Sequence, residues 1–349
     1  MLNMETLSKR HELDLKKSNW CYFTGMKKAL ITGATGQDGI YLARFLVNKG
    51  YEVTATTSQK LTAPSVKFLK EINPSISLIQ MSILESESII KTIGEVQPDE
   101  IYNLASISSV SQSFQEPELT HEVNAEGPMR IINAISTLKI SESVRVFQAS
   151  SSEMFGQSKN SPQNELTPFN PTSPYALSKT YAHTKSGLAR ENGVFVACGI
   201  MFNHESQYRG EAFVSKKICR GVAEIALGIK KELIIGSLEP MRDWGFAGDY
   251  VEAMWAMLQH SLPEDFVIAT GTSRSIRDFV QLALRLTNLT GELHDYIYQD
   301  PRLFRKNELS STVGDAAKAH RLLNWKPTTT FDSMVQTMIT NEIKILTRG

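Results

Sequence analysis

The sequence predicts an α/β protein built on a doubly wound parallel sheet, with a second, smaller α/β lobe that binds substrate. Two observations support this fold class. Short apolar runs alternate with segments of helical periodicity over residues 26–200, as in successive βαβ units, and the first unit has glycines between its strand and its helix. We expect residues 26–200 to form mainly the sheet domain and 201–349 mainly the substrate lobe, with the chain free to cross back. Residues 1–25 are mixed and charged, which favours a flexible extension.

The first unit runs from an apolar strand at 27–32 through a helix at 40–46 to a strand at 51–56. Gly33 permits a tight turn, Gly36 allows a pyrophosphate to approach the helix N-terminus, and Gly39 permits close packing of helix on strand. This pattern predicts a dinucleotide-binding Rossmann fold, although a tight turn without a ligand would need the same residues. The cofactor contacts expected in this turn are Gly33, Thr35, Gly36, Gln37, Asp38 and Gly39.

The end of the second strand bears on the choice of cofactor. An acidic residue there would bind the ribose of NAD, and a basic residue would accommodate the 2′-phosphate of NADP. Residues 56–60 read TTSQK, with no acid and no arginine. We therefore expect NADP, through Ser58 with Lys60 nearby, while NAD is not excluded.

The remaining units of the first domain follow in order. Helices are expected near 65–72, 86–96 and 120–138, and strands at 77–81, 100–105 and 144–149. Small residues after the fourth strand would let a nicotinamide ribose lie close, and a solvated loop is the alternative. The contacts expected there are Leu104, Ala105 and Ser106. Serines 150–152 and Glu153 follow the fifth strand, at the sheet edge where ligands bind in open α/β folds.

Tyr175 and Lys179 lie four residues apart at the start of a predicted helix, with Ser173 as N-cap and Pro174 in the first turn. On one helix face, the ammonium of Lys179 would draw the pKa of the Tyr175 phenol down towards neutrality. Such a phenol can take a proton from a sugar hydroxyl while a hydride leaves the same carbon. The spacing is common, and an ordinary amphipathic helix would also show it.

Composition excludes several classes of function. Lys+Arg and Asp+Glu are equal at 37 each, which argues against nucleic acid or an anionic membrane as a partner. No apolar run is long enough to span a bilayer. The three cysteines are too scattered for a disulfide framework or a metal site, so we expect no metal and a cytoplasmic location.

In the second lobe we expect a strand at 194–202, a helix at 213–227, a strand at 233–236 and a loop carrying Arg242. The first strand leads to Asn203 and His204, of which the histidine is more often a packed core residue. Helices at 315–324 and 331–346 complete the lobe as packing elements.

Several stretches together resemble the extended short-chain dehydrogenase/reductase superfamily and, within it, the GDP-mannose 4,6-dehydratase family. The resemblance spans about residues 27–340. It rests on TGATGQDG at 32–39, QPDEIYNLA at 97–105, SSSEMFG at 150–156, FNHES at 202–206 with RGE at 209–211, RDWG at 242–245 and DPRLFR at 300–305.

The resemblance implies a redox-neutral cycle. Tyr175, supported by Lys179, would accept the C4 hydroxyl proton while a hydride passes to a tightly held NADP, and Ser151 would orient the C4 oxygen. Glu153 would take the C5 proton as water leaves C6, and the hydride would return to C6. The product would be a 4-keto-6-deoxy sugar nucleotide. Outside this context, Glu153 would be an ordinary solvated or capping residue.

The resemblance also implies a GDP-sugar substrate and a homodimer or homotetramer. The substrate contacts it implies are Asn203, Lys217, Arg242, Arg305 and Glu308. Lys217 lies in a two-lysine run that would equally suit a solvated face. The alternative functions are a reductase or epimerase acting on a related nucleotide sugar, and a non-catalytic relative.

Three departures from the family bear on cofactor and substrate. The family's arginine pair after the second strand is missing, Ser82 replaces an aspartate that contacts adenine, and 107–110 read ISSV in place of QSHV. Another GDP-hexose or a GDP-heptose could use the same machinery.

Overall fold

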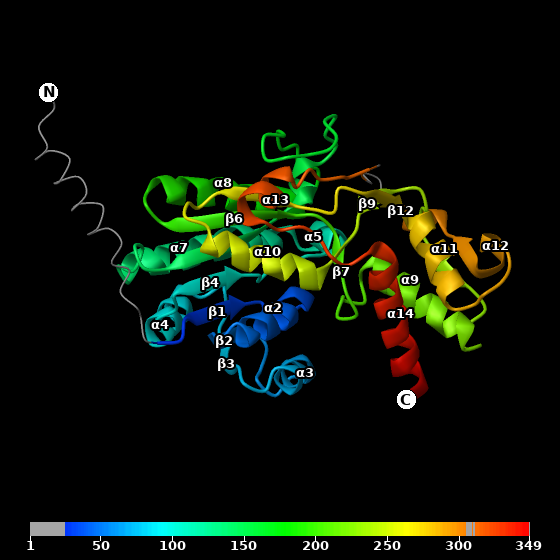
Figure 1. Cartoon of the computed structure of the whole chain (residues 1–349), viewed down its shortest axis with the longest axis horizontal. Helices are drawn as coiled ribbons and strands as arrows, with labels where there is room; N and C mark the ends of the chain where they lie inside the picture. The colour runs from blue at the N-terminus through cyan, green and yellow to red at the C-terminus, as the bar shows by residue number, and fades with distance from the viewer. Residues whose placement is uncertain (1–24, 305–308, 310, 349) are drawn as a thin grey trace, which may run out of the picture.

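The computed structural model describes residues 25–304, 309 and 311–348. Within these residues, parallel strands form a seven-stranded sheet. The strands are β1 (Lys28–Thr32), β2 (Glu52–Thr57), β3 (Ser77–Gln80), β4 (Glu100–Asn103), β5 (Arg145–Ser151), β6 (Phe195–Met201) and β11 (Asp265–Ile268). Their order, β11-β6-β5-β4-β1-β2-β3, confirms the doubly wound Rossmann sheet predicted from the sequence (Figure 1).

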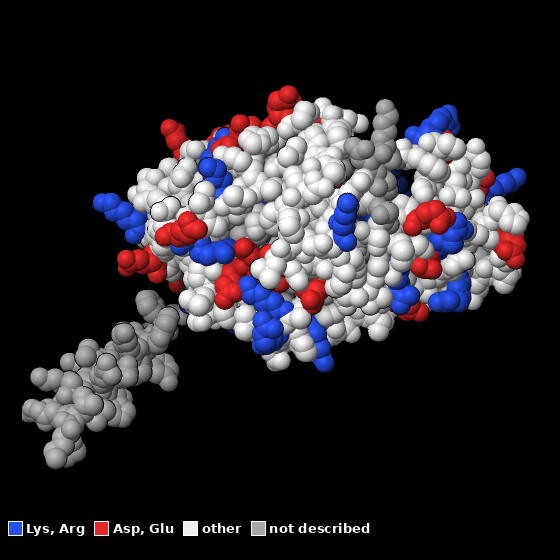
Figure 2. Space-filling model, turned by 90° about the horizontal axis from the view of Figure 1, so that it is seen from above, with Lys and Arg blue, Asp and Glu red and all other residues white. Residues whose placement is uncertain are grey.

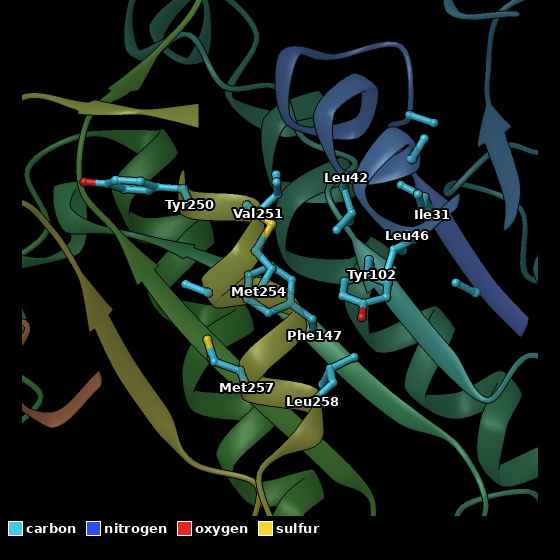
Figure 3. Packing of buried hydrophobic residues seen from close by; sticks show 14 of the residues in the cluster. Ile31, Leu42, Leu46, Tyr102, Phe147, Tyr250, Val251, Met254, Met257 and Leu258 are labelled. Carbon is cyan, nitrogen blue, oxygen red and sulfur yellow. The ribbon is translucent and has the colours of Figure 1, made fainter. Parts of the chain in front are cut away.

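Helices cover both faces of this sheet. One face carries α2 (Gln37–Asn48), α3 (Pro64–Ile72), α10 (Ala247–Gln259) and α13 (Ala317–Leu323), and the other carries α4 (Ser86–Val96), α7 (Gly127–Thr137) and α8 (Pro174–Glu191). Side chains of successive strand residues point to opposite faces, so Ile31 packs with α2 and α10 while Leu30 packs with α4 and α7. Because both faces are covered, buried residues run continuously along the central strands, as in β1 and β4, rather than alternating with exposed ones. Figure 3 shows the first face, where Leu42 and Leu46 of α2 lie near Met254 and Leu258 of α10.

The second lobe lies at the opposite side of the molecule from α4 and α7 (Figure 1). Its core forms between α9 (Val214–Ala226), α11 (Ile276–Leu286) and α14 (Phe331–Arg348). Short strand pairs surround this core. They are β7 (His204–Glu205) with β10 (Gly245–Phe246), β9 (Met241–Asp243) with β12 (Ser273–Ser275), and β8 (Leu233–Ile235) with β13 (Ile297–Gln299). Two one-turn helices, α12 (Leu293–Tyr296) and η3 (Pro301–Leu303), complete it.

The chain after residue 200 returns to the first domain. Strand β11 pairs with β6 and forms one edge of the main sheet, and α10 packs on α2, β5 and β6. Residues from both halves of the chain therefore build the Rossmann core.

The structure corrects two sequence-based expectations of secondary structure. The helix expected at 120–138 is helical from 117 to 137 but contains a π-helical turn, η1 (Glu122–Glu126), between α6 (Pro117–His121) and α7. Pro128 lacks an N–H and cannot donate to a carbonyl four residues earlier, which accounts for the wider turn ahead of it. Arg242 lies in strand β9, not in a loop. Helix α5 (Val110–Gln115) was not expected.

Two buried carboxylates fasten the C-terminal segments to the body of the protein. Asp243 accepts hydrogen bonds from the backbone N–H groups of Thr270, Gly271 and Gly314 at 2.8–3.1 Å. Asp249, in the first turn of α10, accepts from the backbone N–H and the hydroxyl of both Thr328 and Thr329 at 2.8–3.1 Å. The two carboxylates therefore fix the backbone of these segments at defined positions.

Lys and Arg side chains are interspersed with Asp and Glu on the face shown in Figure 2. No single-signed patch covers that face, as expected from the balanced composition. Among the described residues, no helix is both long and apolar enough to cross a bilayer.

A cluster of buried and partly exposed charged side chains lies between α8 and the sheet edge formed by β6 and β11. His183 Nε2 lies 3.5 Å from Asp265 Oδ2, and Arg190 pairs with the other oxygen of Asp265. Burial alone would lower the pKa of His183, but its hydrogen bonds to Asp265 and Cys198 and the charge of Asp265 outweigh burial and raise the pKa to about 10. His183 and Arg190 hold the pKa of Asp265 well below its usual range despite burial.

Replacing Asp249 by alanine should lower the free energy of unfolding by about 3 kcal/mol, because buried N–H and hydroxyl donors of Thr328 and Thr329 lose their acceptor. Urea denaturation measures this change. Asp332→Ala is the control, since its carboxylate is exposed, and it should change stability by less than about 0.5 kcal/mol. Equal effects of the two substitutions would contradict the role given to Asp249.

The His183–Asp265 pair predicts a pH dependence of stability. The pKa of His183 is higher in the folded protein than in the unfolded chain, so its contribution is complete below about pH 6.5 and is lost as the pH rises towards 10. The depressed pKa of Asp265 makes the pair persist down to about pH 4. The stability difference between wild type and His183→Gln in urea should therefore be largest near pH 6 and smallest near pH 10. His294→Gln, at an exposed site, controls for loss of a surface histidine. A difference that does not change with pH would contradict this pairing.

Candidate active site

A cleft of about 1310 Å³ lies at the carboxyl ends of the central strands, between the Rossmann domain and the second lobe. Every described residue that the sequence analysis assigned to the site lines this cleft. They are Gly33, Thr35, Gly36, Gln37, Asp38, Gly39, Ser58, Leu104, Ala105, Ser106, Ser151, Glu153, Tyr175, Lys179, Asn203, Lys217 and Arg242. Arg305 and Glu308 lie outside the described residues. The cleft exceeds the usual volume of a pocket for one small ligand, so two ligands can share it.

The glycine-rich turn shows why two of its positions require glycine. Gly33 has a φ of +65°, and a Cβ there would lie 2.7 Å from the backbone nitrogen of Ala105. A Cβ on Gly39 would lie 2.4 Å from the Cα of Ala34, so helix α2 could not pack as closely. Gly36 is the N-cap of α2 and no side chain caps it. The first N–H groups of the helix therefore face the cleft without a side-chain acceptor, which suits a phosphate group.

A row of hydrogen-bonded polar side chains lies next to the glycine-rich turn, across strands β1, β4 and β5. Thr32 Oγ1 donates to Asn103 Oδ1 at 2.6 Å and accepts from the N–H groups of Leu104 and Ala105 at 3.2 Å. Asn103 in turn donates to Gln148 on β5 at 2.8 Å. This row joins the ends of β1, β4 and β5 and sets the path of the small residues after β4.

Asn124 holds the next part of that loop. From the π-helical turn, its Oδ1 accepts from Ser106 Oγ and from the N–H of Ile107, and its Nδ2 donates to the Ile107 carbonyl. The sequence analysis did not single out Asn124, because the π turn that aims its side chain at the loop has no periodic signature.

Gln37 and Asp38 connect the glycine turn to the FNHES segment of the second half of the chain. Gln37 Nε2 donates to the His204 carbonyl and Gln37 Oε1 accepts from Ser206 Oγ, both at 2.8 Å. His204 Nε2 lies 2.9 Å from Asp38 Oδ2, and its ring stacks on Tyr250. Burial alone would raise the pKa of Asp38, but the charge of His204 holds it below its usual value. Among described residues, Asp38 Oδ1 is buried without a hydrogen-bond partner beside the cleft.

The end of β2 presents only uncharged groups to the cleft. Thr57, Ser58 and Gln59 line it there, and Thr57 Oγ1 accepts from the N–H of Gln59 at 3.1 Å. Ser82, from the segment after β3, also lines the cleft. The ribose side of the site is thus built from hydroxyl and amide groups, without a carboxylate.

The four predicted catalytic residues come together from three elements, β5, η2 and α8. Ser151 ends β5, and Glu153 follows in the one-turn helix η2 (Ser152–Phe155), where Ser151 Oγ accepts from the N–H of Glu153 at 3.2 Å. Tyr175 and Lys179 lie on the first turns of α8, which begins at Pro174 with Ser173 as N-cap. The Tyr175 hydroxyl hydrogen bonds with Ser151, and the charge of Glu153 acts on it as well.

The predicted drop in the pKa of Tyr175 is wrong for the protein without ligand. Burial disfavours the phenolate and raises the pKa to about 12, against the hydrogen bond from Ser151. Lys179 does not offset this, because its Nζ lies 5.8 Å from the Tyr175 ring centroid and donates to the Ala149 carbonyl at 3.0 Å. Burial also lowers the pKa of Lys179 to about 8. Sequence spacing placed the pair correctly but could not report how deeply the phenol is buried.

The substrate-side residues differ in their surroundings. Arg242 is buried, and its Nη1 donates to the carbonyls of Met241 and Leu309 at 2.8 Å. Lys217 is exposed on α9. Arg209 also lines the cleft, with its guanidinium 3.6 Å from the Phe213 ring centroid and its Nε 3.0 Å from Glu205. The sequence analysis quoted Arg209 only as part of a motif, although its spacing of four from Glu205 was a usable signal.

A group of possible metal ligands lies outside the cleft lining. Donor atoms of His183, Cys198 and Asp265 lie within 4.8 Å of one another. The guanidinium of Arg190 pairs with Asp265 and lies 3.8 Å from Cys198 Sγ. A metal ion there would face this permanent positive charge, so the cluster does not suit a cation.

A solved structure with the same fold is UDP-glucose 4-epimerase from Stenotrophomonas maltophila with bound NAD and formylated UDP-arabinopyranose. It has a TM-score of 0.81 and 19% identity, and the match covers 93% of this chain and 100% of that chain. At this identity the likeness concerns the fold.

Sequence relatives are closer. GDP-mannose 4,6-dehydratase of Yersinia enterocolitica is 39% identical, with 91% of this chain and 94% of that protein covered. GDP-mannose 4,6 dehydratase of Drosophila melanogaster is 42% identical, with 93% and 88% covered. The sequence model of GDP-mannose 4,6 dehydratase matches residues 30–338. The chain therefore belongs to the GDP-mannose 4,6-dehydratase family.

Proposed function

We propose that the protein is a hydro-lyase that converts GDP-mannose, or a close GDP-sugar, into the GDP-4-keto-6-deoxy sugar with loss of water. The observation that carries this proposal is the carboxylate of Glu153 in the same cleft as Tyr175 and Ser151, close enough for its charge to act on the phenol. With a nicotinamide to accept and return the hydride, a phenol and a hydroxyl would suffice to oxidise and reduce C4 of a sugar. Elimination across C5 and C6 needs a further base, and Glu153 provides one.

Each residue has a separate role in this proposal. Tyr175 takes the proton of the C4 hydroxyl in its phenolate form, which the positive charge of a bound oxidised nicotinamide would favour over the raised pKa of the ligand-free site, and Ser151 Oγ orients the C4 oxygen. Once C4 is a ketone, the C5 proton is acidic and passes to Glu153, which then protonates the departing C6 hydroxyl. When C6 receives the hydride, C5 takes up a proton. The number of protons balances if the proton that Tyr175 accepted from the C4 hydroxyl reaches C5, through Glu153 or through solvent.

The glycine turn, the uncapped start of α2 and the unpartnered Asp38 Oδ1 fit a nicotinamide dinucleotide. When bound, it would supply a hydride acceptor for C4 and a hydride donor for C6, so the cycle consumes none of it. The proposed contacts are those assigned from the sequence, from Gly33 to Ser106, together with Tyr175 and Lys179. NADP is the proposed form, because the hydroxyl of Ser58 can donate to a 2′-phosphate and no carboxylate at the end of β2 repels it.

The nucleotide sugar would bind on the side of the cleft formed by the second lobe. Asn203, Lys217 and Arg242 line that side and would meet the sugar and the diphosphate, with Arg305 and Glu308 as further proposed contacts. A homodimer or homotetramer is proposed as well, supported by exposed apolar side chains on the packed helices α5, α6 and α8, namely Phe114, Leu119 and Leu177. Buried free Cys198 and Cys219 suit a cytoplasmic location.

The function is tested with purified protein, GDP-mannose and substoichiometric NADP⁺, with NAD⁺ in a parallel reaction. We expect a sugar nucleotide lighter by one water and carrying a C4 ketone, detected by mass spectrometry and NMR, without net reduction of NADP⁺. Tyr175→Phe should lower kcat by at least about 10²-fold, because it removes only the hydroxyl that accepts the proton.

Other outcomes identify the alternatives. Stoichiometric consumption of the cofactor would indicate a reductase, and an inverted sugar of unchanged mass would indicate an epimerase. Product formation only with NAD⁺ would overturn the choice of cofactor but not the reaction.

Glu153→Gln should separate oxidation from elimination. We expect reduced nicotinamide to accumulate on the enzyme, because C4 oxidation does not need the carboxylate, while water loss slows by about 10²- to 10⁴-fold. Nicotinamide absorbance and product mass report the two steps. Glu52→Gln, at the opposite end of the sheet, is the matched control. Water loss at the wild-type rate would show that another group removes the C5 proton.

A further inference from the structure

Helix α8 carries polar side chains on the face that it buries. Tyr175, Lys179 and His183 are spaced four apart, lie on one face of the helix, and are each less than a tenth exposed. The first two reach the cleft. His183 is not part of the cleft lining and has no role in the chemistry proposed above.

His183 contacts the supports of the other catalytic residues. Its Nδ1 lies 2.9 Å from the hydroxyl of Ser150, the residue before Ser151. Its ring meets Phe169 edge-on at 5.0 Å between centroids, and Phe169 packs on Phe155, two residues after Glu153. From α8, His183 therefore contacts both the end of β5, at Ser150, and Phe169, which packs against η2.

Its other nitrogen is anchored at the far edge of the sheet. Asp265 on β11 lies 3.5 Å from Nε2, and Arg190, two turns further along α8, pairs with the same carboxylate. Asp265 and Arg190 are partly exposed, whereas the imidazole is buried and has this carboxylate as its charged partner. The imidazole consequently links a fixed point on β11 to the hydroxyl of Ser150.

On the basis of the proposed function, we propose that His183 is a positioning residue: through its contact with Ser150 it holds the end of β5 and the η2 turn against α8, so that Ser151 and Glu153 face Tyr175. The contact with Asp265 orients the ring, and the contact with Ser150 acts on the catalytic turn. A displacement of about 1 Å in a reacting group can cost about 10²-fold in rate, so loss of this contact should lower kcat. It should leave KM for the sugar nucleotide nearly unchanged, because His183 lies outside the cleft lining.

Two amide substitutions separate the two contacts of the ring. His183→Asn places an amide near the position of Nδ1 and can keep the contact with Ser150. His183→Gln places it near Nε2 and can keep the contact with Asp265. We expect His183→Gln to lower kcat by about 10- to 10²-fold with KM within about 2-fold of wild type, and His183→Asn to recover most of that loss. Ser186→Ala is the matched control, since Ser186 is buried one turn further along α8 and its hydroxyl has no partner among described residues.

A second measurement does not depend on activity. Hydrogen exchange of backbone amides in ligand-free protein should become faster over residues 149–156 in His183→Gln, and remain as in wild type in His183→Asn and Ser186→Ala. Exchange that is unchanged over 149–156 in His183→Gln would overturn the proposal, whatever the substrate proves to be.

The kinetic results can also overturn the proposal. Equal losses of kcat in the two amide variants would show that the contact with Ser150 does not position the catalytic residues. If His183→Gln does not fold, a kcat for His183→Asn reduced by more than about 10-fold also overturns it. A wild-type protein that does not convert GDP-mannose would contradict the proposed function and leave the exchange result to stand alone.

Discussion

The active site depends on the contact between α8 and the end of β5. A helix that packs on a sheet usually buries apolar side chains, and apolar packing tolerates small shifts. Here the buried face of α8 is polar, and Lys179 donates to the Ala149 carbonyl while His183 meets the hydroxyl of Ser150. Hydrogen bonds are directional, so these contacts fix both the rotation and the axial position of the helix. Tyr175 is placed against Ser151 as a result.

A second set of polar contacts joins the two halves of the chain around the cleft. Gln37 and Asp38 come from the most recognisable motif of the first half, and they meet His204 and Ser206 from the second. In a sequence, such motif residues suggest direct contact with a ligand. In the structure, their side chains also hold the start of α2, next to the glycine turn, against the segment that follows Asn203. A ligand in the cleft therefore meets two surfaces that are already locked to each other.

Much of this fold could be predicted from the sequence. Strands buried on both faces are rich in apolar residues, and glycines mark the turn where helix and strand pack closely, so the strands and the longer helices up to β6 could be predicted. The short helix α5 and the π-helical turn could not. Nor could the strand containing Arg242, because its three residues are too few for a periodic pattern. The pKa of Tyr175 depends on burial by distant segments, which no local spacing encodes. His183 and Asp265 are far apart in the chain, and only the return of β11 to the sheet brings them together.

That return has a consequence for how the protein can be divided. The edge strand β11 and the helix α10, which covers β5 and β6, come later in the sequence than α9, the first helix of the second lobe. A fragment ending near residue 200 would expose the apolar faces that α10 covers and leave β6 as an open edge, which invites aggregation. Neither half is a transferable module, so exchanging the second lobe between relatives at that boundary would also break the Rossmann core.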